Sequence, residues 1–262
     1  AAEQSTGGVA RRRAGGWTPD NVQVHNAHYG LGAAAIIATM YANAYGRFSV
    51  TDNVCGMSLA AVDATGSPVP VGVNSKAAIF ATGNGTANGT PATPVYNDSV
   101  GGARSWPLAT SPSTGTTDFA LDSALCHRAI LTGVDTVTGA TLTAATTPTK
   151  AQSDAVRTGV SEVLLNGNLR AKPTLIVGGR SDALIPVNNS ERAYTAYNRV
   201  VEGSASKLRY IEVANAQHFD AFIPFSGFDN RYVPLHAYFN QSMNAMYAHL
   251  KTGAALPASQ VI

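Results

Sequence analysis

A carboxylate and a histidine follow two short apolar segments in the second half of the chain. Asp182 comes shortly after residues 174–177, and His218 comes shortly after residues 208–213. The first segment is typical of a buried parallel strand, and the second is interpreted as the next strand of the same sheet. Because open α/β sheets place their sites at the carboxyl ends of such strands, we expect the two side chains to meet. The alternative is that Asp182 is a turn residue and His218 an ordinary loop histidine.

Such a pair has a definite chemistry. A buried carboxylate that accepts a hydrogen bond from one ring nitrogen of histidine fixes the tautomer of the imidazole. The other ring nitrogen is then available as a general base for a hydroxyl nucleophile. Asp182 and His218 are therefore predicted to be the acid and the base of a Ser, Asp, His triad, in the chain order of α/β hydrolases.

Two serines that precede this pair are candidates for the nucleophile. Ser58 lies in GMSLA, one small residue away from the GxSxG pattern, and Ser5 begins STGG. A nucleophilic serine of this type needs a buried strand before it and a helix after it. Ser5 has only four residues ahead of it, and we assign the nucleophile to neither serine.

Aromatic residues follow the histidine closely, beginning with Phe219 and Phe222. They are interpreted either as ordinary core or as the apolar wall of an acyl pocket, which makes Phe219 and Phe222 candidate substrate-binding residues.

The two cysteines, Cys55 and Cys126, lie 71 positions apart. They form either a disulfide, as in an oxidising compartment, or two buried thiols. Neither has the partner spacing of a zinc site or of a redox CxxC motif. The glycines of ATGNGT (81–86) lack the strand and helix of a phosphate-binding loop. No metal and no cofactor are predicted.

Composition excludes several kinds of partner. The chain has 262 residues, of which 45% are hydrophobic and 13% charged, with a formal net charge of +2. Nucleic acid and anionic membranes need a concentrated positive field, so neither is predicted as a partner. The longest apolar run, residues 31–40, is too short to span a bilayer. The abundance of Thr, Ser, Asn, Gly and Ala favours a secreted or periplasmic protein.

The predicted elements form one α/β domain, 1–262, with a parallel sheet flanked by helices. The segment up to Asn21 is predicted to be irregular. Residues 65–113, rich in Gly, Thr and Asn, are interpreted as a polar insertion or the edge of a lid. Helical spacing and glycine stops predict helices at 30–47, 118–131, 150–165, 188–201 and 234–250.

Several long motifs resemble the D-(-)-3-hydroxybutyrate oligomer hydrolase family. The resemblance covers roughly residues 21–262 and is most specific from residue 172 onward. The motifs are YANAYGRFSV (41–50), GRSDAL (179–184), NAQHFDAF (215–222), VPLH (233–236) and MNAMYAHL (243–250).

The resemblance implies a serine esterase that cuts 3-hydroxybutyrate oligomers released from polyhydroxybutyrate, often outside the cell. Asp182 and His218 match the acid and base positions by context. In this family the nucleophilic serine lies in a Ser-Asn-Gly-Gly turn a few residues before a helix containing AAEQ, and this chain begins with AAEQ. We therefore expect the serine upstream of residue 1, and the chain to be the carboxyl half of an α/β-hydrolase fold.

Two expectations and two alternatives follow from these residues. The chain acts on a small ester or oligoester, and an upstream polypeptide completes its fold. An esterase of other substrates, such as a carboxylesterase or polyester hydrolase, is the alternative within the same chemistry. A non-catalytic protein that binds esters or polymers is the alternative from a different class.

Overall fold

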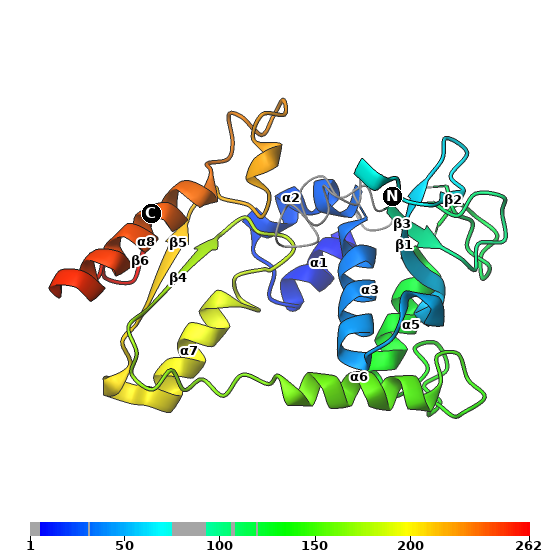
Figure 1. Cartoon of the computed structure of the whole chain (residues 1–262), viewed down its shortest axis with the longest axis horizontal. Coiled ribbons are helices and arrows are strands. Elements are labelled where there is room, and N and C mark those ends of the chain that lie inside the picture. The colour runs from blue at the N-terminus through cyan, green and yellow to red at the C-terminus, as the bar shows by residue number, and fades with distance from the viewer. Residues whose placement is uncertain (1–5, 31, 75–92, 106–107, 119) are drawn as a thin grey trace. The chain divides into compact units, whose positions relative to one another are not determined.

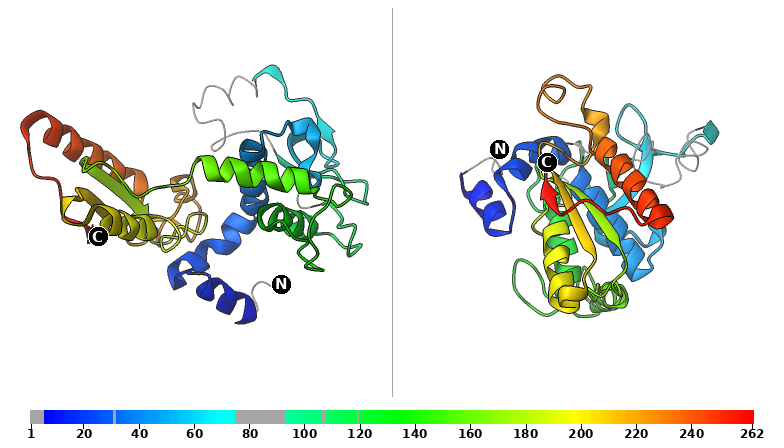
Figure 2. Two further views of the ribbon diagram at one scale, coloured as in Figure 1. Left: turned by 90° about the horizontal axis from the view of Figure 1, so that it is seen from below. Right: turned by 90° about the vertical axis from the view of Figure 1, so that its left-hand side faces the viewer.

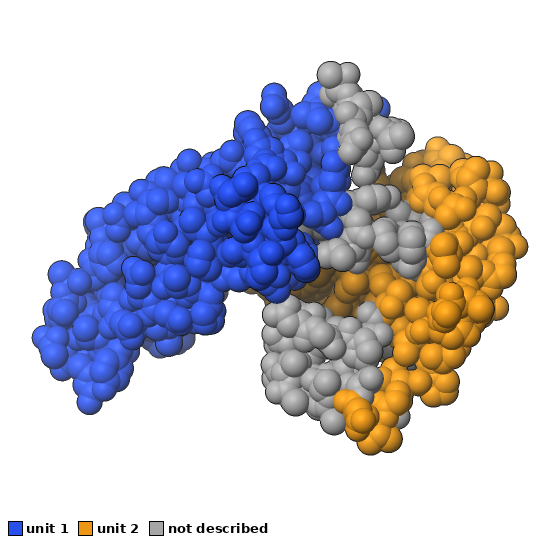
Figure 3. All heavy atoms as spheres, turned by 90° about the horizontal axis from the view of Figure 1, so that it is seen from above, with its two compact units in different colours: residues 1–31, 165–262 blue, residues 32–164 orange. Residues whose placement is uncertain are grey.

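A computed structural model describes residues 6–30, 32–74, 93–105, 108–118 and 120–262 of the chain. These residues form two compact units, which Figure 3 colours separately. Unit 1 comprises Ala1–Leu31 and Leu165–Ile262, and unit 2 comprises Gly32–Leu164. The sequence predicts one domain, 1–262, and the structure groups the residues in two units.

Unit 1 is built on a three-stranded parallel sheet of order β4-β5-β6. The predicted strands are confirmed as β4 (Thr174–Gly179) and β5 (Leu208–Val213), and β6 (Gln260–Val261) adds a short edge. The register pairs Gly179 with Val213, so β4 and β5 end at the same edge of the sheet. The loops that follow the two strands therefore start side by side.

Helices cover both faces of this sheet. The two views of Figure 2 show the sheet between α7 (Glu191–Glu202) and α8 (Leu235–Thr252), both of which the sequence predicts to within three residues. Under α8, Ile211, Val213 and Ala216 form a buried apolar cluster. Unit 1 is thus an α/β arrangement of a parallel sheet flanked by helices.

The segment predicted to be irregular is helical. It forms α1 (Thr6–Ala14) and most of the first turn of α2 (Pro19–Gly30), so this prediction is wrong. The weak apolar periodicity of α2 explains the error, because the helix is fixed by a few contacts to other parts of unit 1. The 3₁₀ turns of unit 1 are η4 (Gly203–Ala205) and η5 (Asp220–Phe222).

In its described part, unit 2 combines helices with a small antiparallel sheet (Figure 1). The elements are α3 (Ala33–Gly46), η2 (Val50–Asp52), η3 (Val54–Gly56), β1 (Met57–Val62), β2 (Pro68–Val69), β3 (Thr93–Tyr96), α5 (Ala120–Thr132) and α6 (Lys150–Glu162). A Cβ at Gly159 would lie 2.0 Å from the carbonyl oxygen of Tyr45. The helices α3, which contains Tyr45, and α6, which contains Gly159, therefore pack closely only because residue 159 is glycine.

The polar segment 65–113 contributes to the core of unit 2. Tyr96 on β3 and Ala109 are buried in one cluster with Met57 and Ala35. Residues 75–92 of this segment lie outside the described residues. The described part therefore packs as an integral piece of unit 2.

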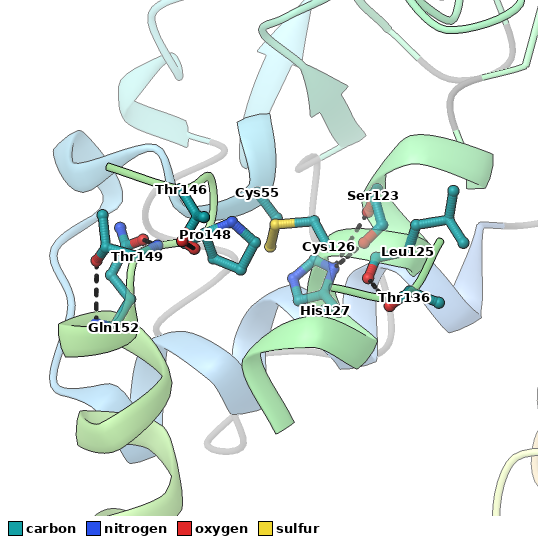
Figure 4. The surroundings of a disulfide bond; sticks show 10 residues. All are labelled: Cys55, Ser123, Leu125, Cys126, His127, Thr136, Thr146, Pro148, Thr149 and Gln152. Atoms are coloured by element: carbon teal, nitrogen blue, oxygen red, sulfur yellow. Dashed lines mark hydrogen bonds between the residues drawn. A yellow bond between two sulfur atoms is a disulfide. The ribbon is translucent and has the colours of Figure 1, made fainter. Parts of the chain in front are cut away.

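The structure joins the two cysteines in a disulfide between η3 and α5 (Figure 4). Cys55 packs there with Val54, Ile130 and Val156 in a buried cluster. A cross-link at this place holds the loop between α3 and β1 on the helix α5. None of the helices that the structure describes has the length and apolar character needed to cross a membrane.

Candidate active site

Asp182 and His218 meet at the carboxyl edge of the parallel sheet. We call residues 180–186, after β4, the acid loop and residues 214–219, after β5, the histidine loop. The Nδ1 of His218 lies 2.8 Å from Oδ2 of Asp182, although 36 positions separate the two residues. The sequence predicts this contact from strand order alone.

The environment of Asp182 makes it a fixed hydrogen-bond acceptor. The residue is 5% exposed. Its Oδ1 accepts hydrogen bonds from the backbone N–H groups of Leu184 and Ile185, at 2.8 Å each. One oxygen is thus occupied by the acid loop itself, and the other is directed at His218. A carboxylate held in this way orients the imidazole and stabilises its charged form.

His218 has one ring nitrogen engaged and one available. In the neutral tautomer that suits Asp182, Nδ1 carries the proton and Nε2 carries the lone pair. The imidazole side chain is 33% exposed, and no residue that the structure describes hydrogen-bonds to Nε2. The pKa of His218 is raised by the hydrogen bond to Asp182, against burial, with the charges of Asp182 and Glu191 adding to the rise. The arrangement is that of a general base.

The acid loop and the histidine loop approach each other at backbone level. Arg180 N donates to the carbonyl of Val213 at 2.9 Å, and Ser181 N donates to that of Ala216 at 2.8 Å. A Cβ at Gly179 would lie 2.7 Å from the carbonyl oxygen of Ala216. Glycine at 179 therefore permits the close approach on which the distance between Asp182 and His218 depends.

A buried ion cluster lies on β5 and includes the first residue of the acid loop. The carboxylate of Glu212 is 3% exposed and accepts from Arg180 Nε at 2.6 Å and from Arg192 Nη2 at 2.6 Å. Tyr210 donates to the same carboxylate at 3.1 Å. Burial alone would raise the pKa of Glu212, but hydrogen bonds from Arg192, Arg180 and Tyr210 lower it to about 2. The cluster links the acid loop, β5 and α7.

A buried asparagine contacts the acid loop from α2. Nδ2 of Asn21 donates to the carbonyl oxygens of Arg180 and Asp182, at 2.7 Å each. The sequence analysis identified neither this residue nor Glu212. A carboxylate inside a strand of a buried parallel sheet was a usable signal for Glu212. The sequence contains no comparable signal for Asn21.

Of the two candidate serines, the structure describes Ser58 and does not place it as a nucleophile. Ser58 lies inside β1, and its Oγ accepts a hydrogen bond from Nδ2 of Asn97 at 2.8 Å. Strand continues to Val62 after it, so the turn into a helix that a nucleophilic serine needs is missing at this position. Ser5 lies outside the described residues.

The aromatic residues form a row that begins at His218. Phe219 contacts the imidazole edge-on with ring centroids 4.7 Å apart, and Phe222 lies 5.0 Å from Phe219. Phe225 and Phe228 then lie 6.1 and 5.7 Å from Phe222. Their role as an apolar wall beside the histidine stays a prediction.

Metal-ligating side chains do not cluster in the part of the chain that the structure describes. No group of three or more His, Cys, Asp or Glu residues there is arranged to hold an ion.

Comparisons with known proteins agree along the whole chain. The model of the 3HB-oligomer hydrolase family matches residues 1–262. A protein named D-(-)-3-hydroxybutyrate oligomer hydrolase from Albidiferax ferrireducens is 47% identical over 269 residues, which cover 100% of this chain and 35% of the relative. Proteins of the same name from Polaromonas naphthalenivorans and Ralstonia pickettii are 44% and 40% identical and cover 100% of this chain.

The chain spans about a third of the length of the curated relatives it matches, 35% for the first and 33% for the last of these three. No solved structure matches it. With a family model that matches every residue and identities of 40 to 47% to these relatives, the chain belongs to the 3HB-oligomer hydrolase family.

Proposed function

We propose that this chain carries the acid and the base of a serine esterase that hydrolyses 3-hydroxybutyrate oligomers. The single observation that carries the proposal is the hydrogen bond between His218 Nδ1 and Asp182 Oδ2, on an imidazole whose Nε2 has no hydrogen-bond partner among the described residues. The substrate follows from the names of the relatives, each of which is called a 3-hydroxybutyrate oligomer hydrolase.

The proposed reaction proceeds through an acyl-enzyme. Nε2 of His218 removes the proton of the serine hydroxyl as its oxygen attacks the ester carbonyl. The protonated imidazole, stabilised by Asp182, then gives this proton to the departing alkoxide of the oligomer. Water attacks the acyl-enzyme in the second half, with His218 again removing and returning a proton, which releases the acid and regenerates the serine.

We place the serine in polypeptide upstream of residue 1. Support comes from Ser58, which lies within a strand, and from Nε2 of His218, which has no serine partner among the described residues. The same upstream polypeptide would complete an α/β-hydrolase fold, of which the parallel strands β4 and β5 with their acid and histidine loops are one part.

Two surfaces of unit 1 favour the proposal that an additional polypeptide packs against this unit. Strand β4 is an edge of its sheet among the described residues, and an edge strand offers backbone groups for pairing with a further strand. Helix α8 exposes a row of large apolar side chains along one side, beside its packed residue Leu235. The row consists of Phe239, Met243, Tyr247 and Leu250, each at least 48% exposed.

We also propose a secreted or periplasmic location, because disulfides persist in oxidising compartments and the structure joins Cys55 to Cys126.

The test uses this chain co-expressed with the upstream part of a curated relative. We expect hydrolysis of 3-hydroxybutyrate dimer and trimer, labelling of an upstream serine by a fluorophosphonate probe, and loss of both in His218→Ala. His236→Ala, an exposed histidine on α8, is the matched control and should retain activity. Turnover of other esters but not of the oligomers would favour a general carboxylesterase. Oligomer binding without turnover would favour a binding protein.

A further inference from the structure

The side chain of Asn21 is completely buried and fully hydrogen-bonded. It is 0% exposed and lies in the first turn of α2. Its Nδ2 uses both hydrogens on the carbonyl oxygens of Arg180 and Asp182. Its Oδ1 accepts from the backbone N and from Oγ1 of Thr18, at 2.9 Å each. Every polar position of this amide is therefore paired.

The orientation of the amide is determined by chemistry. A carbonyl oxygen can only accept, so the group that faces Arg180 and Asp182 must be the NH₂ group. The backbone N–H of Thr18 can only donate, so the group that faces it must be the oxygen. Exchanging the two ends would leave at least three of these contacts repulsive or unmade.

Apolar packing holds the base of α2 in place. Val24, one turn after Asn21, is buried in a cluster with Ala183 of the acid loop and Tyr232, and Trp17 packs against it. The amide of Asn21 is therefore presented from a fixed helix to a loop about 160 positions away in the sequence, as the separations of 159 and 161 show.

The two carbonyls that Asn21 binds belong to residues on either side of Ser181. Drawing both toward one amino group curls the acid loop between them, and the side chain of Asp182 leaves this curl toward His218. We propose that Asn21 is a positioning residue of the active site, which fixes the curvature of the acid loop and thereby the contact between Asp182 and His218. This inference rests on the proposed function of the pair.

The test replaces Asn21 with leucine, which has nearly the same shape but no hydrogen-bonding groups. The readout is the titration of the His218 ring followed by NMR, together with the resonance of its hydrogen-bonded Nδ1 proton. Besides Asp182, the charge of Glu191 acts on this ring, and neither group is altered. We expect the pKa of His218 to fall toward its ordinary value and the Nδ1 proton to exchange faster.

Asn198→Leu is the matched control. Asn198 is also 0% exposed, and its amide makes three hydrogen bonds, to Gly167, Glu202 and Ser206. It lies on α7 and contacts neither the acid loop nor the histidine loop in any hydrogen bond. The control should lose stability to a similar extent and keep the pKa of His218. Equal changes in both variants, or an unchanged pKa in Asn21→Leu, would overturn the proposal.

Thr18→Val is a milder variant for the case in which Asn21→Leu does not fold. It removes the hydroxyl that donates to Oδ1 of Asn21, so this oxygen keeps the hydrogen bond from the backbone N of Thr18 alone. We expect a smaller fall in the pKa of His218, and no fall would overturn the proposal.

In the complete enzyme, Asn21→Leu should lower kcat by up to about 10²-fold with KM nearly unchanged, as for a misplaced catalytic group. The two hypotheses fail separately. If His218 titrates as expected in the chain and in Asn21→Leu, but the enzyme keeps its activity in His218→Ala, the proposed function alone is refuted. An active, His218-dependent enzyme whose Asn21→Leu variant keeps its kcat and its His218 pKa would refute the role of Asn21 alone.

Discussion

Replacing Gly179 with alanine tests whether the approach of the two loops sets the geometry of the pair. The new Cβ would lie 2.7 Å from the carbonyl oxygen of Ala216 and 3.0 Å from its carbonyl carbon, both of which are backbone atoms. Ordinary contacts of a Cβ begin at 3.4 Å, so the loops must separate by about 0.7 Å. The hydrogen bond from Ser181 N to Ala216 O, now 2.8 Å, would then lengthen to the limit of a hydrogen bond.

The cost of this separation has two parts. Overpacking against backbone destabilises by about 1 to 3 kcal/mol. A displacement of this size between acid and base lowers kcat by on the order of 10- to 10²-fold. Urea unfolding of the chain measures the first part, and turnover of 3-hydroxybutyrate dimer by the complete enzyme measures the second. The pKa of His218 should fall at the same time, because its hydrogen bond to Asp182 weakens.

Gly102→Ala is the control, because a Cβ there meets nothing within 4 Å and its φ is not positive. It should change the free energy of unfolding by less than about 0.5 kcal/mol or stabilise slightly. If Gly179→Ala matched this control in stability, kcat and His218 pKa, the close approach at Gly179 would have no part in positioning the pair.

Three further predictions concern other bonds of the structure. The loop of 71 residues closed by Cys55 and Cys126 should contribute about 4 kcal/mol in the chain-entropy model, measured as the loss in urea stability of Cys126→Ala; no loss would contradict the disulfide. The raised pKa of His218 stabilises the fold below its ordinary value of 6.5, and this contribution is lost as pH rises through the folded pKa. Asp182→Asn should therefore cost more stability at about pH 5 than at about pH 9, and an equal cost at both would refute the pairing. The lowered pKa of Glu212 stabilises the fold at pH values above 4.5, the ordinary pKa of this group. About 3 kcal/mol of the free energy of unfolding should therefore be lost as the pH falls from 4.5 to about 2. In Glu212→Gln, the free energy of unfolding should depend less on pH below about 4.5. An unchanged dependence in this range would contradict the ion cluster around Glu212.

Much of unit 1 could be predicted because its elements have local signals. An apolar run bounded by proline and glycine marks β4, and β5 matches its predicted range 208–213. Helices α7 and α8 have glycine directly after their ends, at Gly203 and Gly253. The helices α1 and α2 were missed because they have little apolar periodicity.

The candidate site likewise has one contact that the sequence predicts and others that it does not. The meeting of Asp182 and His218 follows from the order of parallel strands, which the sequence shows. The contacts of Asn21 join side chain to backbone carbonyls across about 160 positions, and they leave no spacing or periodicity to detect. The strand of Ser58 was missed as well, because its pairing partners on β3 lie far along the chain, beyond a polar segment.

The long separation between Asn21 and the acid loop has a consequence for how the molecule folds. Strands β4 and β5 are joined by a single helix, so their pairing closes a short loop and can form early. The contacts of Asn21 close a loop of 161 positions, whose entropic cost is greater and whose formation is slower. The sheet can therefore exist before the acid loop reaches its final curvature. In refolding experiments the environment of His218 should mature in a later phase than the secondary structure of unit 1.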